Sequence, residues 1–202
     1  MKNLKSVLAD ADTDNHVQII EQKTEFSGPI FTVYNDDVEF RFGDRAWRQY
    51  MDHHDAVAIV ALRNIDFEPE ILLIRQYRHA ARRIFWEIPA GLRDHPGEDG
   101  LIAAQRELAE ETDMQAEHWE PLVSFYASPG CSNENLDVYL ATDITSVTDR
   151  ENSACGFERV EEEREIETGW FALSQVLEAV QCGKLRSPTL VAGVLAAALR
   201  YR

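Results

Sequence analysis

The first quarter of the chain alternates short runs of β-branched and aromatic residues with turn-forming residues. The turn-forming residues lie at positions 27–29, 35–37 and 43–44. This alternation predicts a small antiparallel sheet of about three strands within residues 1–53. Because so small a sheet is marginal by itself, it must bury one face against a partner subunit or against the rest of the chain.

The hydrophobic pattern changes at Ala56. Residues 56–62 and 71–77 are apolar runs of strand length, which favours central strands that are covered on both faces. Further strands are expected at residues 121–127, 136–142 and 168–173. A long acidic loop is expected over residues 143–167.

Two helices are expected near the end of the chain and a third in its middle. Ser174 can cap a helix that continues to Cys182 and ends at Gly183. Pro188 stands at the permitted first position of an Ala/Leu-rich final helix. Strands interleaved with helices predict an α/β fold, an α/β/α sandwich, for residues 54–202.

The middle helix lies between Trp86 and Met114 and carries the candidate chemistry. At about 100° per residue its packing side is one stripe, and Glu107, Glu110 and Glu111 form an acidic patch along the edge of that stripe. The stripe consists of Leu101, Ala104, Leu108 and Thr112. Like charges at this spacing destabilise a helix, and partly burying them costs more. A divalent cation removes both penalties, although such a patch by itself is more often a solvated face.

The residues around the patch favour the metal interpretation. Pro89 stiffens a turn, and Gly91 lets the backbone approach a ligand closely, so the carbonyl of Ala90 is a further candidate ligand. Arg106 can orient the neighbouring acids through a forked ion pair. Arg78, at the end of a strand, is either a clamp for a diphosphate or an exposed strand-end charge.

Charge narrows the possible partners. With 20 basic and 36 acidic residues, the net charge is −16, which repels nucleic acid and anionic membranes. It also repels a phosphorylated substrate, so a metal and local arginines become more necessary. The three cysteines are scattered without a CxxC pair, and no apolar run approaches 18 residues. We therefore expect a soluble cytoplasmic protein with free thiols.

The stretch from Gly91 to Asp113 resembles the Nudix box, a glycine loop followed by a helix that carries Arg-Glu-apolar-x-Glu-Glu. The matching residues are Glu98, Arg106, Glu107, Leu108, Glu110 and Glu111. The chain departs from the box in two places: the loop is one residue longer, and Asp113 stands where a glycine is usual. Neither departure removes a metal ligand, and aspartate tolerates the left-handed backbone conformation.

Further segments resemble the ADP-ribose pyrophosphatase branch of the Nudix family, especially its bacterial members. Pro129 lies sixteen residues after Asp113, which is the marker of that branch, and RQYRH, WEIPAGL and SPGCSNE are similar to it. The resemblance implies a Nudix α/β/α sandwich with a mixed sheet. It also implies a homodimer, in which the β-sheet domain of residues 1–53 covers the substrate of the partner.

The resemblance implies roles for individual residues. The metal ligands, for two or three Mg²⁺ or Mn²⁺ ions, would be Ala90, Glu107, Glu110 and Glu111. The catalytic residues would be Arg106, Glu110 and either Glu162 or Glu163 as the base. The substrate-binding residues would be Arg78, Arg48, Phe31 and Glu134. Phe31 and Arg48 could equally be ordinary strand packing, the acidic run at 161–163 could be a solvated loop, and Arg164 stands where some members carry a second acid.

The function implied is divalent-metal-dependent hydrolysis of ADP-ribose to AMP and ribose 5-phosphate. One alternative is another nucleoside diphosphate derivative as substrate, such as a nucleotide sugar or NADH. A more distant alternative is a non-catalytic Nudix-fold sensor of ADP-ribose. The sensor is disfavoured because all the glutamates of the box are present and no DNA-binding segment is added.

Overall fold

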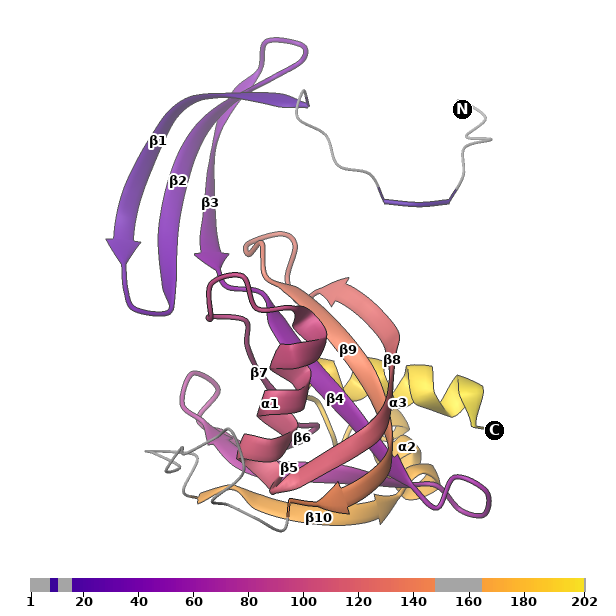
Figure 1. Ribbon diagram of the computed structural model, residues 1–202. Helices are drawn as coiled ribbons and strands as arrows, with labels where there is room; N and C mark the ends of the chain where they lie inside the picture. Colours follow the sequence, from indigo (N-terminus) through magenta and orange to yellow (C-terminus); the bar gives the residue numbers. More distant parts are fainter. Residues whose placement is uncertain (1–7, 11–15, 148–164, 202) are drawn as a thin grey trace. The chain divides into compact units, whose positions relative to one another are not determined.

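The computed structural model describes residues 8–10, 16–147 and 165–201. Internal contacts divide the chain into two compact units, Met1–His53 and His54–Arg202, which are drawn in Figure 1. Within the described residues, no helix is both long enough and apolar enough to cross a membrane. Cys131 and Cys182 are exposed free thiols, and Cys155 lies outside the described residues.

The described part of the N-terminal unit is a three-stranded antiparallel sheet. Its strands, in spatial order, are β1 (Val17–Ser27), β2 (Phe31–Phe40) and β3 (Arg45–His53). The break predicted at residues 35–37 is wrong, because β2 continues through it. Asn35 donates a hydrogen bond to Glu25 on β1 at 3.0 Å, and Asp37 forms an ion pair with Arg45 on β3. These cross-strand pairs offset the low strand propensity of Asn and Asp.

The described part of the second unit contains one mixed sheet of seven strands, ordered β10-β5-β4-β9-β8, with β6 beside β5 and β7 beside β4. Strands β4 and β9 are parallel, whereas the other pairs are antiparallel. The strands are β4 (Ala56–Arg63), β5 (Glu70–Arg78), β6 (Arg83–Glu87), β7 (Ala90–Leu92), β8 (Met114–Tyr126), β9 (Asn135–Ser146) and β10 (Glu167–Ala172).

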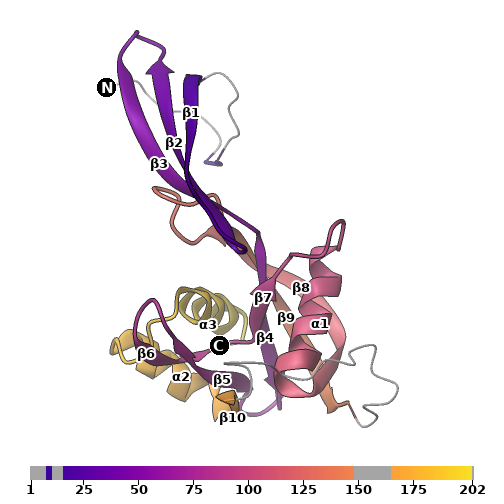
Figure 2. The same ribbon diagram turned by 90° about the vertical axis from the view of Figure 1, so that its left-hand side faces the viewer.

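Helices cover both faces of this sheet. Helix α1 (Gly100–Thr112) lies on one face, while α2 (Leu173–Gln181) and α3 (Pro188–Arg200) lie on the other, as Figure 2 shows. Strand β4 packs in both directions: Val57, Ile59 and Ala61 belong to the apolar cluster under α1. Ala58, Val60 and Leu62 belong to the cluster under α2 and α3. The predicted α/β/α sandwich is confirmed, and the two-sided burial explains why the run at 56–62 is continuously apolar.

Several local expectations need correction. Strands β6 and β7 were not predicted, and the expected turn at Ala90 and Gly91 is part of β7, which pairs with β4. The loop expected from residue 143 begins later, because β9 continues to Ser146. Ser174 lies inside α2, where its hydroxyl donates to Glu68 at 3.4 Å, and Ala172 is the N-cap. Pro188 opens α3 as predicted, after Ser187 at the N-cap.

Candidate functional site

Helix α1 carries the acidic patch along the face of the sheet. The carboxylate of Asp99 caps its first turn by accepting a hydrogen bond from the N–H of Leu101 at 2.9 Å. Asp113 ends the helix in the left-handed conformation, with φ of 57° and ψ of 29°, as its tolerance of that region predicts. Leu108 is fully buried, and Glu111, three residues later on the same side, is only 9% exposed. The acidic patch therefore extends from the buried Glu111 to the partly buried Glu107 and Glu110.

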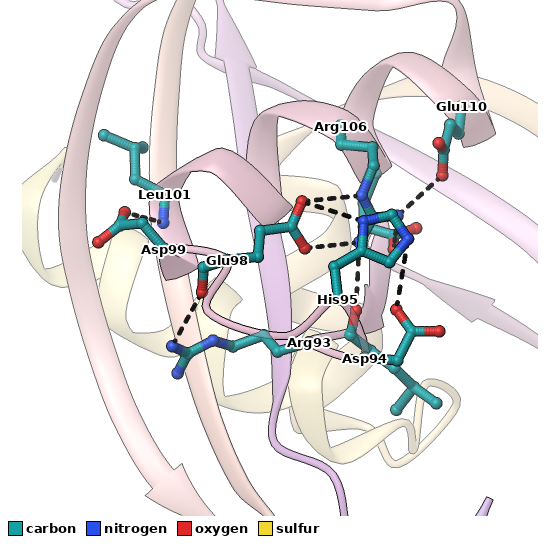
Figure 3. A network of polar contacts seen from close by, with 10 residues as sticks. Arg93, Asp94, His95, Glu98, Asp99, Leu101, Arg106 and Glu110 are labelled. Atoms are coloured by element: carbon teal, nitrogen blue, oxygen red, sulfur yellow. Dashed lines mark hydrogen bonds and ion pairs between the residues drawn. The ribbon is translucent and has the colours of Figure 1, made fainter. Parts of the chain in front are cut away.

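Arg106 joins three glutamates of the box (Figure 3). Its Nε and Nη2 each donate to one carboxylate oxygen of Glu98, both at 3.1 Å. Its Nη1 donates to Glu107 at 2.6 Å and to Glu110 at 3.0 Å. The hydrogen bonds from Arg106 hold the pKa of Glu98 below its usual value. One guanidinium thus fixes three carboxylates and offsets their mutual repulsion.

Glu107 lies against the backbone of β7. A Cβ built on Gly91 would come within 2.0 Å of the carboxyl carbon of Glu107, so glycine is needed there to leave room for the carboxylate. Burial raises the pKa of Glu107 to about 7, and the charges of Glu110 and Asp94 act in the same direction. The charge and hydrogen bond of Arg106 oppose that rise. The negative charge of Glu107 is therefore only partly compensated by the protein.

Glu111 is the most deeply placed acid of the patch. Its carboxylate accepts a hydrogen bond from the N–H of Ala90 at 2.9 Å, which ties α1 to β7. Burial raises its pKa to about 8, against the lowering effect of that hydrogen bond. The charges of Glu107 and Glu87 raise its pKa further, and Arg78 lowers it. Burial therefore favours the protonated form of this carboxyl at neutral pH, and a nearby cation would favour the charged form.

Arg78 reaches the same region from the end of β5. Its Nε and Nη2 donate to one oxygen of Glu87 on β6, at 3.0 and 2.6 Å. Gln76 donates to the same oxygen at 3.2 Å. Because the charges of Arg78 and Glu87 both act on Glu111, this group borders the acidic patch.

The remaining predicted residues are distributed over the chain. Phe31 and Arg48 lie in the N-terminal unit: the ring of Phe31 stacks on His53 with centroids 6.3 Å apart, and Arg48 lies over the ring of Phe40. Glu134 lies in the loop between β8 and β9, where its N–H donates to Ser132 at 3.2 Å. Glu162, Glu163 and Arg164 lie outside the described residues. The substrate and base roles of these residues stay predictions.

No three His, Cys, Asp or Glu side chains converge closely enough to hold a metal ion within the part of the chain that the structure describes. The hydrogen bonds explain this arrangement. Glu107 and Glu110 are turned toward Arg106, and Glu111 is turned toward the backbone of Ala90. A hard cation would have to compete with these donors for carboxylate oxygens.

Sequence reasoning missed two members of the group around Arg78. Glu87 was part of the quoted segment WEIPAGL without a role, and Gln76 had none. A signal existed for Gln76, because Leu72, Ile74 and Gln76 alternate on one face of β5 and only the last is polar. Glu87 gave no such signal, since β6 is short and was not predicted.

Comparisons with known proteins agree with this geometry. The model of the NUDIX domain family matches residues 52–189. The ADP-ribose pyrophosphatase of Mycobacterium tuberculosis is 36% identical over 183 residues, which cover 91% of this chain and 84% of that protein. The methanol dehydrogenase activator of Bacillus methanolicus is 39% identical over 134 residues, which cover 65% and 69%.

A solved structure described as an ADP compounds hydrolase has the same fold. Its TM-score is 0.76 at 21% identity, and the match covers 94% of this chain and 96% of that one. The family match spans more than half of the chain, and the mycobacterial relative is similar over nearly all of it. These findings confirm the resemblance read from the box: the chain belongs to the Nudix hydrolase family, in its ADP-ribose pyrophosphatase branch.

Proposed function

We propose that this protein hydrolyses ADP-ribose to AMP and ribose 5-phosphate with the help of divalent metal ions. The observation that carries the proposal is the pair of carboxyl groups of Glu107 and Glu111 on α1, both largely withdrawn from solvent, with the charge of Arg78 acting on Glu111. In their charged forms these carboxylates repel an anionic diphosphate, so the pair makes chemical sense together with cations that stabilise the charged forms and bind the diphosphate. The name of the mycobacterial relative supports ADP-ribose as the substrate.

The chemistry of the donors fits a hard divalent cation such as Mg²⁺ or Mn²⁺. The candidate ligands are oxygens only, namely the carboxylates of Glu107, Glu110 and Glu111 and the carbonyl of Ala90. Gly91 leaves space for the Glu107 carboxylate, and burial has raised the pKa of two of these acids. When bound, two or three such ions would neutralise the diphosphate and lower the pKa of the attacking water.

The side chains of the protein would bind, orient and move a proton. Arg78 would donate hydrogen bonds to the diphosphate, and Arg106 would hold Glu107 and Glu110 in place. The oxygen of a water molecule would attack one phosphorus while the bond from that phosphorus to the bridging oxygen breaks. Glu162 or Glu163 would take the proton of the water, and the bridging oxygen would leave with the other phosphate.

The N-terminal unit would complete the site from a partner subunit. We propose a cytoplasmic homodimer in which Phe31 stacks on adenine, Arg48 contacts a phosphate and Glu134 contacts the substrate. Exposed apolar side chains on the N-terminal sheet, such as Ile19, support a role in association. Size-exclusion chromatography with light scattering tests this: a dimer mass is expected, and a monomer mass at working concentrations would contradict it.

The proposed substrate is tested with a panel of diphosphates. Purified protein with Mg²⁺ is incubated with ADP-ribose, a nucleotide sugar or NADH, and the release of AMP or sugar phosphate is measured. ADP-ribose should have the highest kcat/KM, whereas a higher value for another compound would transfer the proposal to that substrate. The Glu111→Gln variant should remain folded and lose roughly a hundredfold or more in kcat, because charge stabilisation in the transition state is removed.

A further inference from the structure

One carboxylate near the site has no role in the reaction described so far. Glu87 accepts three hydrogen bonds on a single oxygen, two from Arg78 and one from Gln76. Its side chain is 9% exposed, and Gln76 is 7% exposed. A buried carboxylate is costly unless it is paired and hydrogen-bonded, and a well-packed apolar residue would serve the fold at least as well. The position of this group therefore calls for a functional explanation.

The alternation of β5 places the group on the face of the sheet that carries the acidic patch. Leu72 belongs to the apolar cluster under α1. Side chains at even spacing from Leu72 point to the same face, which puts Gln76 and Arg78 there. Glu87 joins them from β6, which pairs with β5. The charges of Arg78 and Glu87 both reach Glu111, so the group and the patch are neighbours.

The hydrogen bonds leave part of the Arg78 guanidinium available to a substrate. Glu87 is bound by Nε and Nη2, whereas a guanidinium has five N–H donors in a fixed plane. Nη1 can still donate to a phosphate oxygen, and the side chain of Arg78 is 47% exposed. A long side chain held in one orientation before binding loses less conformational entropy when the substrate arrives.

We propose that Glu87 is a positioning residue: it holds Arg78 in the orientation that binds the diphosphate of the substrate, and Gln76 holds Glu87. This inference rests on the proposed function, because it concerns how that site binds a diphosphate. It assigns a role to two residues on the β5–β6 hairpin that do not belong to the acidic helix. The negative charge of Glu87 opposes substrate binding, and its benefit lies in the orientation of Arg78.

A double-mutant cycle tests whether Glu87 acts through Arg78. The variants are Glu87→Ala, Arg78→Ala and the double variant, and kcat and KM for ADP-ribose are measured for each. In the wild-type background, Glu87→Ala should lower kcat/KM by about ten- to a hundredfold, mainly by raising KM. In the Arg78→Ala background the same change should cost less than about twofold, because the partner is already gone. Glu87→Gln, which retains an acceptor oxygen, should recover part of the loss.

A matched control exists at the other end of β5. One oxygen of Glu70 accepts from Nε of Arg63 at 2.8 Å and from Asn64 at 2.7 Å, which is the same combination of guanidinium and amide. Glu70→Ala should leave kcat/KM unchanged. The proposal is overturned if the single variant Glu87→Ala has the same kcat/KM as the wild-type protein. It is also overturned if the loss is equal in both backgrounds, which would indicate damage to the fold.

A second measurement separates this proposal from the choice of substrate. The exchange rate of the Nε–H of Arg78 with solvent, followed by ¹⁵N NMR, should be slow in the unchanged protein and fast in Glu87→Ala. Equal rates would overturn the positioning role whatever the protein hydrolyses. If the panel identifies another diphosphate as the preferred substrate, the proposal that ADP-ribose is the substrate fails. The double-mutant cycle, run on that other compound, still decides the role of Glu87.

Discussion

Two acidic side chains of α1 are placed where the protein opposes their charge. Glu107 lies against the backbone at Gly91, and Glu111 is buried beside Ala90. Desolvation raises the pKa of both carboxyl groups, to about 7 and about 8. Residues selected only for stability would not combine these features, because a neutral side chain of similar size avoids the desolvation. The combination points to a ligand that carries positive charge.

The raised pKa of Glu111 predicts how stability depends on pH in the presence of a chelator. Its pKa is about 8 in the folded chain and near 4.5 in the unfolded chain, so the folded state binds more protons between these values. The contribution of Glu111 to the free energy of unfolding should be largest below pH 4.5. It should fall by on the order of a few kcal/mol as the pH rises toward 8. Chemical denaturation at about pH 5, 6, 7 and 8 measures the free energy of unfolding across this range.

The control for this prediction is Glu111→Gln, which cannot titrate. Its free energy of unfolding should depend less on pH over the same window than that of the unchanged protein. Addition of Mg²⁺ should stabilise the unchanged protein most at the alkaline end, where the carboxylate is charged. Identical pH profiles for the two proteins would contradict the burial of a titrating carboxyl at this position.

Replacing Gly91 by alanine should reduce activity more than it reduces stability. A Cβ at this position collides with the carboxylate of Glu107, which is the end of a flexible side chain and can move away. Gly91→Ala should therefore remain folded and lose roughly a hundredfold in kcat, because Glu107 is displaced. Gly130→Ala is the control, since a Cβ there meets no atom within 4 Å. Comparable kcat values for the two variants would remove Glu107 from the mechanism.

The elements show which parts of the structure can be predicted from the sequence. The two-sided burial of β4, the antiparallel N-terminal sheet and the start of α3 at Pro188 followed from local patterns. The glutamates of α1 followed from helical spacing and from the resemblance. These features depend on neighbours in the sequence, and that is the information a pattern contains.

Other features depend on contacts between distant segments. Asn35 and Asp37 were expected in a turn because of their propensity, but partners on β1 and β3 keep them in a strand. The role of Glu87 depends on the pairing of β5 with β6 and on the nearness of α1. Ser174 resembles an N-cap, yet the helix begins one residue before it. Contacts with residues that are distant in the sequence determine the structure and the role of such positions. Local sequence patterns do not contain this information.

Helix α3 packs closely on the sheet at Gly193, so a larger side chain there should reduce stability. A Cβ there would lie 2.8 Å from a methyl group of Val60 and 3.1 Å from one of Ile88, both in the core of the sheet. Gly193→Ala should lower the free energy of unfolding by about 1–3 kcal/mol, since overpacking outweighs the gain of about 1 kcal/mol in helix propensity. Denaturant unfolding measures the change. An increase in stability would show that α3 can move away from β4 at little cost.

The whole molecule is strongly acidic, with a net charge of −16, while its proposed substrate is an anion. Long-range repulsion therefore opposes the approach of ADP-ribose, and only the local groups of the site attract it. Added salt screens the long-range field more strongly than contacts within the site. The charge thus favours a site in which cations and Arg78 do most of the recognition.

This balance predicts the salt dependence of the reaction. At a fixed concentration of Mg²⁺, raising NaCl from about 20 to about 200 mM should increase kcat/KM for ADP-ribose by a few-fold, through screening of the repulsion. The effect should appear in KM and not in kcat, because it concerns the encounter. A steep fall of kcat/KM with salt would instead show that the region around the site attracts the substrate at long range.

The central claim is that Glu107 and Glu111 form a divalent-metal site, and metal binding tests it without reference to turnover. Free Mn²⁺ is measured by electron paramagnetic resonance during titration with the unchanged protein, with Glu111→Gln and with Glu107→Gln, all shown to be folded by circular dichroism. The account predicts saturable binding by the unchanged protein, strengthened by ADP-ribose, and binding at least about tenfold weaker in both variants. Equal Mn²⁺ affinity in all three proteins would contradict it.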